Sequence, residues 1–155
     1  MGIKNYTTVV AEERTVAEIQ TLLSMKGARS IQIDYDDKTR PSSVSFVIVI
    51  QEVPVPFRLP CNFDGVFRAM AREYSSPRAR RHFENSSESM AQARRCAWRI
   101  VKDWVAAQMA LIEAEQATLA QVFLPYAVVS GPDRLTMYDQ FMLSVSSQKS
   151  LSAGV

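Results

Sequence analysis

Hydrophobic and polar residues alternate along the middle of the chain with the period of two that strands require. In 30–35, apolar residues stand at every second position between polar ones, which predicts a half-buried strand. The segment 44–50 is apolar on both faces, so we expect a central strand covered on both sides. In 53–59, Pro54 and Pro56 lack N–H groups on the same side, which predicts an edge strand.

The segment before these strands carries the signals of a helix start and a helix end. Residues 5–10 are β-prone and predict a short first strand. Thr15 and Glu18 then have the spacing of a capping box, in which each side chain bonds to a free backbone N–H. Apolar residues on one helical face follow this box and predict a helix over 16–26, with Gly27 placed to cap its C-terminus.

Two further helices are predicted after the strands. Asn62 can cap a helix over 63–74, where apolar residues repeat at helical spacing. Asn85 and Glu88 form a second capping-box candidate. The chain then contains no Gly or Pro to about residue 116 and is rich in helix-forming residues, which predicts one long helix.

The last part of the chain carries shorter signals. Thr118 and Gln121 again have capping-box spacing and predict a short helix that Pro125 ends. After a Ser-Gly-Pro turn, residues 134–143 form an amphipathic pattern that predicts a last helix. The Ser-rich segment 144–155 has no pattern of core residues, so we expect a flexible tail.

These elements predict an α+β fold, in which helices pack on a small antiparallel sheet of three or four strands and one long helix lies in the C-terminal half. The 155 residues suit one domain, which we place at 1–143, with 144–155 as the tail. A hydrophobic content of 47% with 22% charged residues excludes wholesale disorder. The chain has no apolar run that could span a bilayer, and its start lacks the apolar segment of a signal peptide. We therefore expect a cytoplasmic protein that does not enter a membrane.

Residues with catalytic or metal-binding chemistry are few and scattered. The glycines form no phosphate-binding loop, and the single histidine, His82, has no Ser or Cys partner nearby in the sequence. Cys61 and Cys96 are expected to be reduced thiols, and their spacing to His82 matches no zinc pattern. The acidic turn at 34–37 lacks the Gly and the downstream Glu of a calcium loop. We expect no enzyme, no metal and no cofactor, although carboxylates far apart in sequence can converge in space.

Basic residues gather before the long helix and continue onto one of its faces. Arg95, Arg99 and Lys102 are spaced i, i+4, i+7 and share a face, and Trp98 lies one turn from Lys102. The net charge of +2 is too small to imply nucleic-acid binding by itself, but arginines around an exposed aromatic residue favour phosphates and bases. We name this set the basic surface: Arg78, Arg80, Arg81, Arg94, Arg95, Trp98, Arg99 and Lys102.

Two simpler interpretations of the basic surface stay open. An Arg-rich helix face is usually only solvated, and nearby acidic residues dilute its charge. These are Glu84, Glu88, Asp103 and Glu113. Trp98 stands at the edge of a wide apolar stripe and can belong to the boundary of the core instead, while Trp104, nearly opposite Arg95, is assigned to the core itself.

Several segments of the chain resemble a family of small uncharacterised proteins from phages and integrated mobile elements. The segments are AWRIVKDW at 97–104, AQMALIEA at 107–114 and FLPY at 123–126, together with TVAEI at 15–19 and PFRLP at 56–60. The similarity covers about residues 5–140 and leaves out the tail. The family has no established activity, so the resemblance implies no catalytic residue. It implies a setting, which is a phage or prophage gene that acts in a bacterial cell.

Three hypotheses follow. The first is a non-enzymatic accessory protein that binds nucleic acid, DNA or RNA, through the basic surface. The alternative is an inhibitor of a bacterial defence system, similar to anti-CRISPR proteins, that binds a host protein complex. The third is a homo-oligomer whose long helix pairs through its apolar stripe. The exposure of Trp98 discriminates among them, because a buried Trp98 cannot stack on bases and would favour the two protein-binding hypotheses.

Overall fold

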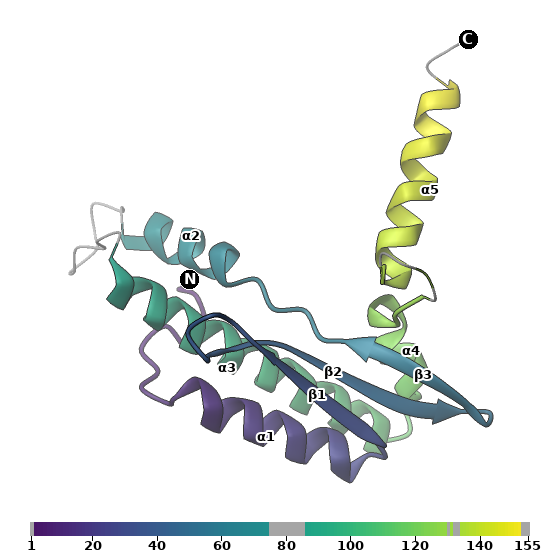
Figure 1. Ribbon diagram of the computed structural model, residues 1–155, viewed down its shortest axis with the longest axis horizontal. Helices are drawn as coiled ribbons and strands as arrows, with labels where there is room; N and C mark the ends of the chain where they lie inside the picture. Colours follow the sequence, from purple (N-terminus) through teal and green to yellow (C-terminus); the bar gives the residue numbers. More distant parts are fainter. Residues whose placement is uncertain (1, 75–85, 130, 132–133, 153–155) are drawn as a thin grey trace.

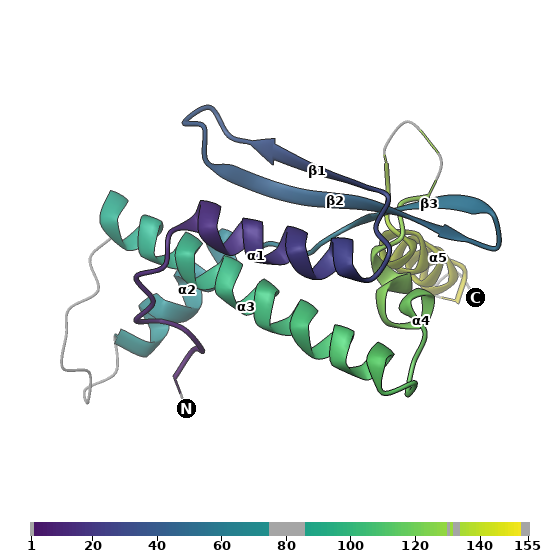
Figure 2. The ribbon, with the colours of Figure 1, turned by 90° about the horizontal axis from the view of Figure 1, so that it is seen from below.

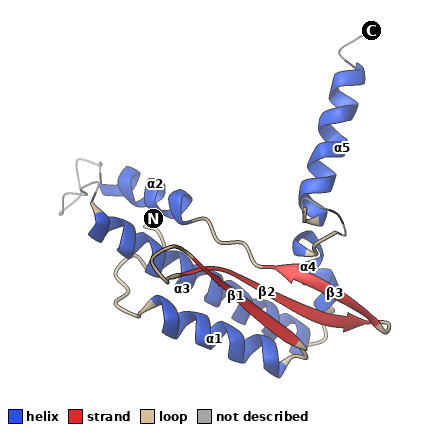
Figure 3. Ribbon diagram, in the orientation of Figure 1, coloured by secondary structure: helices blue, strands red, loops and turns tan. Residues whose placement is uncertain are grey.

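The computed structural model describes residues 2–74, 86–129, 131 and 134–152. The described elements are α1 (Glu12–Met25), β1 (Ser30–Tyr35), β2 (Pro41–Ile50), β3 (Val53–Arg58), α2 (Phe63–Tyr74), α3 (Ser87–Glu113), α4 (Leu119–Phe123), the 3-10 helix η1 (Leu124–Tyr126) and α5 (Met137–Ser152). Figure 3 shows the three strands of the sheet in red and the helices in blue. The predicted α+β class, with a small antiparallel sheet and one long helix, is confirmed.

The sheet has the order β1-β2-β3, and both pairings are antiparallel. Figure 2 shows α1 and α3 on one face of the sheet and no described helix on the other. Val44, Phe46 and Ile48 of β2 are buried against these helices. Val49 is 47% exposed, so the prediction that this strand is covered on both sides was wrong. Branched apolar residues favour a strand even where one face meets water, so they do not require a second layer.

The strand β3 lies at an edge of the sheet, as Pro54 and Pro56 predicted. Near its end, Ala127 forms a bridge with Phe57, and the N–H of Val128 donates to the carbonyl oxygen of Pro56 at 2.8 Å. Proline lacks a backbone N–H but keeps its carbonyl oxygen, so Pro56 can accept this hydrogen bond. The contact ties the segment between η1 and α5 to the sheet.

The N-terminal segment differs from the prediction. Residues 5–10 form a turn and irregular chain rather than a strand, and Asn5 has a left-handed backbone with φ of 64°. The helix α1 already begins at Glu12, so Thr15 lies inside its first turn and its hydroxyl donates to the carbonyl of Ala11 at 3.3 Å. The capping box at Thr15 was therefore wrong. Glu12 is buried in an ion pair with Arg94 of α3. This tertiary contact stabilises a helix that begins one turn before the predicted start.

The C-terminus of α1 has the predicted glycine cap. Gly27 has φ of 96°, a region that residues with a Cβ enter only at a cost. The N–H of Ala28 donates to the carbonyl of Leu23 at 3.1 Å, and that of Gly27 donates to Ser24 at 3.3 Å. These two bonds form a Schellman motif, which turns the chain from α1 into β1.

The caps of the next helices follow the prediction in part. The bounds of α2 agree with the predicted 63–74, and the side chain of Asn62 accepts from the N–H of Gly65 at 2.8 Å. The cap of α3 is Ser86, which accepts from the N–H of Ser89 at 3.2 Å, whereas the predicted cap, Asn85, lies outside the described residues. The predicted Thr118–Gln121 capping box of α4 is confirmed.

The long helix α3 is packed on two sides. The sheet, α1 and α4 share the main core with it, and α2 packs against another side of α3 over a smaller cluster (Figures 1 and 2). The buried surface of α3 is consequently wider than one helical face. In the described part of the chain, no helix is both long and apolar enough to cross a membrane.

The helix α5 projects from the rest of the molecule (Figure 1) and extends past the predicted domain boundary at residue 143. Thr136 and Asp139 cap its start, since the N–H of Asp139 donates to the hydroxyl of Thr136 at 3.2 Å. The expected tail 144–155 is therefore helical through Ser152. Three of its serines satisfy their hydroxyl groups within the helix. The hydroxyls of Ser144, Ser146 and Ser147 donate to the carbonyls of Phe141, Met142 and Leu143.

Candidate functional site

The basic surface divides into a part that the structure describes and a part that it does not. Its three linker arginines lie outside the described residues: Arg78, Arg80 and Arg81. Its other five members all stand on α3: Arg94, Arg95, Trp98, Arg99 and Lys102. The exposure and the bonded partners of these five side chains decide which of them could contact a nucleic acid.

Trp98 is fully buried, at 0% exposure. Its indole ring packs edge-on against Phe63 at the start of α2, with 5.8 Å between the ring centroids. A nucleic-acid base cannot reach a ring in this position, so stacking through Trp98 is excluded. Of the two interpretations left open for Trp98, the position in the core is therefore the correct one. Trp104, which the sequence assigned to the core, is half-buried at the margin of the same core and packs against Phe123, with 5.5 Å between the ring centroids.

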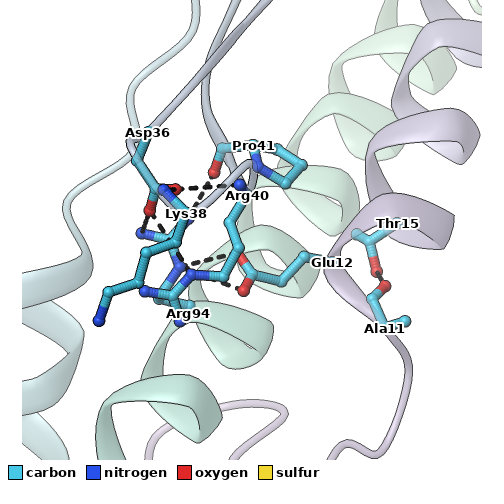
Figure 4. Close-up of polar contacts among 8 residues, drawn as sticks. All are labelled: Ala11, Glu12, Thr15, Asp36, Lys38, Arg40, Pro41 and Arg94. Carbon is cyan, nitrogen blue, oxygen red and sulfur yellow. Dashed lines mark hydrogen bonds and ion pairs between the residues drawn. The ribbon is translucent and has the colours of Figure 1, made fainter. Parts of the chain in front are cut away.

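Arg94 is also buried, at 6% exposure. Its Nε lies 3.1 and 3.0 Å from the two carboxylate oxygens of Glu12, and its Nη2 donates to the carbonyl of Pro41 at 2.6 Å (Figure 4). Its Nη1 is 3.6 Å from Asp36, and its guanidinium lies 4.1 Å from the centroid of the Phe63 ring. All these partners belong to the chain itself. Arg94 therefore joins α1, the β1–β2 hairpin and α3, and it cannot serve as a phosphate contact.

Asp36 organises the hairpin end of this buried network. It accepts from the backbone N–H groups of Arg40 at 2.9 Å and Lys38 at 3.0 Å. The Arg40 N–H is the main cause that holds the pKa of Asp36 below its usual value, and the Lys38 N–H and the charge of Arg94 act in the same direction. The sequence suggested only a solvated turn here. A buried arginine implies a carboxylate partner, but nothing in the sequence identifies Glu12 as that partner.

The two remaining ion-paired members of the basic surface have acidic neighbours. Arg99 donates to Glu18 at 2.7 Å, and the ammonium of Lys102 is 3.6 Å from Asp103. Arg95 is half-buried and bonds to a glutamine side chain one turn earlier. Three of the four charged α3 members of the basic surface, Arg94, Arg99 and Lys102, are thus paired with carboxylates, which weakens their attraction for phosphates, whereas Arg95 bonds to a neutral amide and keeps its charge.

A different surface stands out on α5. Five of its side chains occupy positions i, i+1, i+4, i+5 and i+8, which lie along one side of a helix. We name them the apolar stripe: Met137, Tyr138, Phe141, Met142 and Val145. Each is more than 40% exposed, with Phe141 at 61%. Leu143 is 58% exposed and points to the opposite side.

The sequence predicted an amphipathic helix at 134–143 but assigned it no function. The apolar stripe continues past that boundary to Val145. The signal was the spacing of Tyr138, Phe141, Met142 and Val145, which is i, i+3, i+4, i+7. The serines at 144, 146 and 147 conceal this spacing, because serine is a weak helix former and a Ser-rich segment resembles a tail.

Metal and cysteine chemistry have little support in the described structure. Among the described residues, no group of three or more His, Cys, Asp or Glu side chains is arranged to hold a metal ion. Both thiols are free, Cys61 half-buried and Cys96 buried. Burial raises the pKa of Cys61 to about 12 and that of Cys96 to about 11. Neither thiol is therefore an activated nucleophile.

Thiol labelling provides a direct check of these two pKa shifts. In the native protein at pH 8, we expect both cysteines to react with iodoacetamide at least about 100-fold more slowly than in urea, because the thiolate is the reactive form. Intact-mass spectrometry over time measures both rates. Fast labelling of Cys61 in the native protein would contradict the burial of its thiol.

Comparison of the chain with protein-family models, with curated proteins and with solved structures found no match. The resemblance to the phage family stays a prediction. Among the described residues, exposed large apolar side chains gather on α5, where the apolar stripe lies.

Proposed function

We propose that this protein is a non-enzymatic accessory protein of a phage or another mobile element, and that it acts by binding protein through the apolar stripe of α5. The observation that supports this proposal is the exposure of the apolar stripe on a projecting helix (Figure 1). Contiguous exposed apolar surface commonly marks a site of protein contact. The mobile-element setting rests on the sequence resemblance.

The spacing of the apolar stripe fits one established mode of recognition. An amphipathic helix that lies in an apolar groove presents anchors at i, i+3, i+4 and i+7. Tyr138, Phe141, Met142 and Val145 have this spacing, and two of them are aromatic. Both protein-binding hypotheses require such a surface, and it lies on α5 rather than on the long helix α3, whose apolar side is occupied within the chain.

The nucleic-acid hypothesis has less support. It loses Trp98 and Arg94, which are buried, and Arg99 is engaged by a carboxylate. Its remaining basis is Arg95, which is half-buried and bonds to a neutral glutamine, together with the linker arginines, which lie outside the described residues. A titration of labelled single- and double-stranded DNA at two salt concentrations, followed by fluorescence anisotropy, tests it directly. We expect no micromolar binding that falls steeply with salt.

Site-specific photocrosslinking tests protein binding without assuming the partner. A photoreactive phenylalanine analogue replaces Phe141 in one full-length variant and Leu143 in a matched control. The two positions have similar exposure but lie on opposite sides of α5. On irradiation in bacterial cells, we expect discrete protein adducts from position 141 and few from position 143.

Either of two results would contradict this proposal. Adducts of equal yield from both positions would show that α5 touches proteins without a preferred face. An absence of discrete protein adducts, together with salt-dependent DNA binding, would favour nucleic-acid binding through Arg95 and the linker arginines. An adduct with a foreign protein or with a second copy of the chain would support protein binding through the apolar stripe.

A further inference from the structure

We infer that the occupant of the apolar stripe is a second copy of this chain, so that two α5 helices pack against each other across a two-fold axis. The inference rests on the proposed function, because it uses the same surface and names what covers it. It concerns α5, whereas the sequence suggested pairing through the long helix.

The helix α5 needs a packing surface that the described chain does not supply. It has 16 residues, which is close to the length at which isolated helices are marginal in water. Its many serines are weaker helix formers than alanine or leucine. Its contacts with the body are concentrated at η1 and at the bridge beside Thr136, while every member of the apolar stripe remains exposed. Most helices in proteins are stabilised by burying such a stripe.

The charge pattern favours a second copy over an unrelated protein. Within residues 137–148, the only charged side chain is Asp139. Its carboxylate is engaged by Thr136, which donates from its N–H at 2.9 Å and from its hydroxyl at 2.8 Å. Complementary charges are what usually direct binding to one foreign partner. An uncharged apolar stripe lacks them, and it also meets no like charge when it faces its own copy across a two-fold axis.

The size of the apolar stripe sets the expected strength of this dimer. Tyr138 and Phe141 are 55% and 61% exposed, so together they offer roughly 200 Å² of aromatic surface. The smaller members of the stripe add a comparable area, and a symmetric pair would then bury roughly 800–1,000 Å² in total. This value lies below the roughly 1,200–2,000 Å² of stable specific interfaces and in the range of weak, transient ones. We therefore expect a reversible dimer in the micromolar range.

Sedimentation velocity of the full chain tests the inference, with Phe141→Ser as the disrupting variant and Leu143→Ser as the control. Both variants place one serine in the exposed surface of the same helix, so they have similar effects on its stability. Over roughly 1–100 μM, which brackets the expected affinity, the mass should rise from 17.4 kDa toward twice that value. We expect the dissociation constant to increase at least about 10-fold in Phe141→Ser and less than about 3-fold in Leu143→Ser.

The outcomes separate this inference from the proposed function. A chain that stays monomeric over the whole range, or a dimer that Phe141→Ser leaves intact, would overturn the pairing of α5. Equal loss in both variants would overturn it too, since the contact would not depend on the apolar stripe. If the chain is monomeric but position 141 alone crosslinks to a foreign protein, the proposed function stands without the dimer. Circular dichroism at 222 nm verifies that each variant is folded.

Discussion

The variant Glu12→Leu is expected to lower the free energy of unfolding by about 3–5 kcal/mol, because it removes the buried carboxylate that Arg94 contacts and leaves the guanidinium only the more exposed and more distant Asp36, at 3.6 Å. Both side chains of this pair are only 8% exposed, so water cannot replace the lost partner. Urea denaturation followed by circular dichroism measures the difference. An effect of this size is a large fraction of the total stability of a typical domain, which is about 5–15 kcal/mol.

Two companion variants identify the cause. In Glu12→Leu with Arg94→Met, both charges are absent, and we expect the double variant to regain part of the loss. The recovery is incomplete because Pro41 and Asp36 lose the donor that Arg94 supplied. Glu18→Leu is the matched control, since it removes the more exposed partner of Arg99 and should cost less than about 1 kcal/mol. Equal losses in Glu12→Leu and Glu18→Leu would mean that Arg94 is solvated and free to bind phosphate.

Truncating Trp98 to alanine is expected to cost about 3–5 kcal/mol of unfolding free energy, since the ring is fully buried and its removal leaves a cavity. The Nε1 of Trp98 has no hydrogen-bond partner among the described residues. Trp98→Phe removes this unpaired N–H and fills most of the space, so we expect it to cost less than about 2 kcal/mol. Urea denaturation of both variants provides the comparison.

The control for this series is Trp104→Ala, which removes a half-buried ring and should cost less than Trp98→Ala. Acrylamide quenching adds an independent measurement, because only Trp104 should be accessible in the native protein. A stable Trp98→Ala variant that had lost affinity for DNA would restore the nucleic-acid hypothesis. It would show that the indole is exposed in solution.

The sequence predicted an element well where the contacts that form it join residues close together in the chain. The bounds of α2 follow from the Asn62 cap and from the period of its apolar residues. The end of α1 follows from Gly27, and the edge position of β3 follows from its prolines. Each of these outcomes depends on residues within a few positions of one another, which is the range over which backbone chemistry acts.

Prediction failed where the deciding contact is distant in sequence. The start of α1 depends on Arg94, which is 82 residues from Glu12. The full burial of Trp98 was not predicted, because a helical pattern gives the apolar positions but not which neighbours cover them. Here α2 covers a second side of α3 and encloses Trp98 through Phe63. The same limitation affected α5, whose apolar side has no counterpart within the described chain.

The 82-residue separation between Glu12 and Arg94 also has a consequence for synthesis on the ribosome. At roughly 5–20 residues per second, the carboxylate of Glu12 emerges from the ribosome about 4–16 seconds before its partner Arg94 emerges. During that interval α1 and the three strands lack α3, so the apolar side of the hairpin has only α1 to cover it. We expect the nascent chain to bind, during this interval, chaperones that recognise exposed apolar segments. Its release from them should coincide with the emergence of α3 from the exit tunnel.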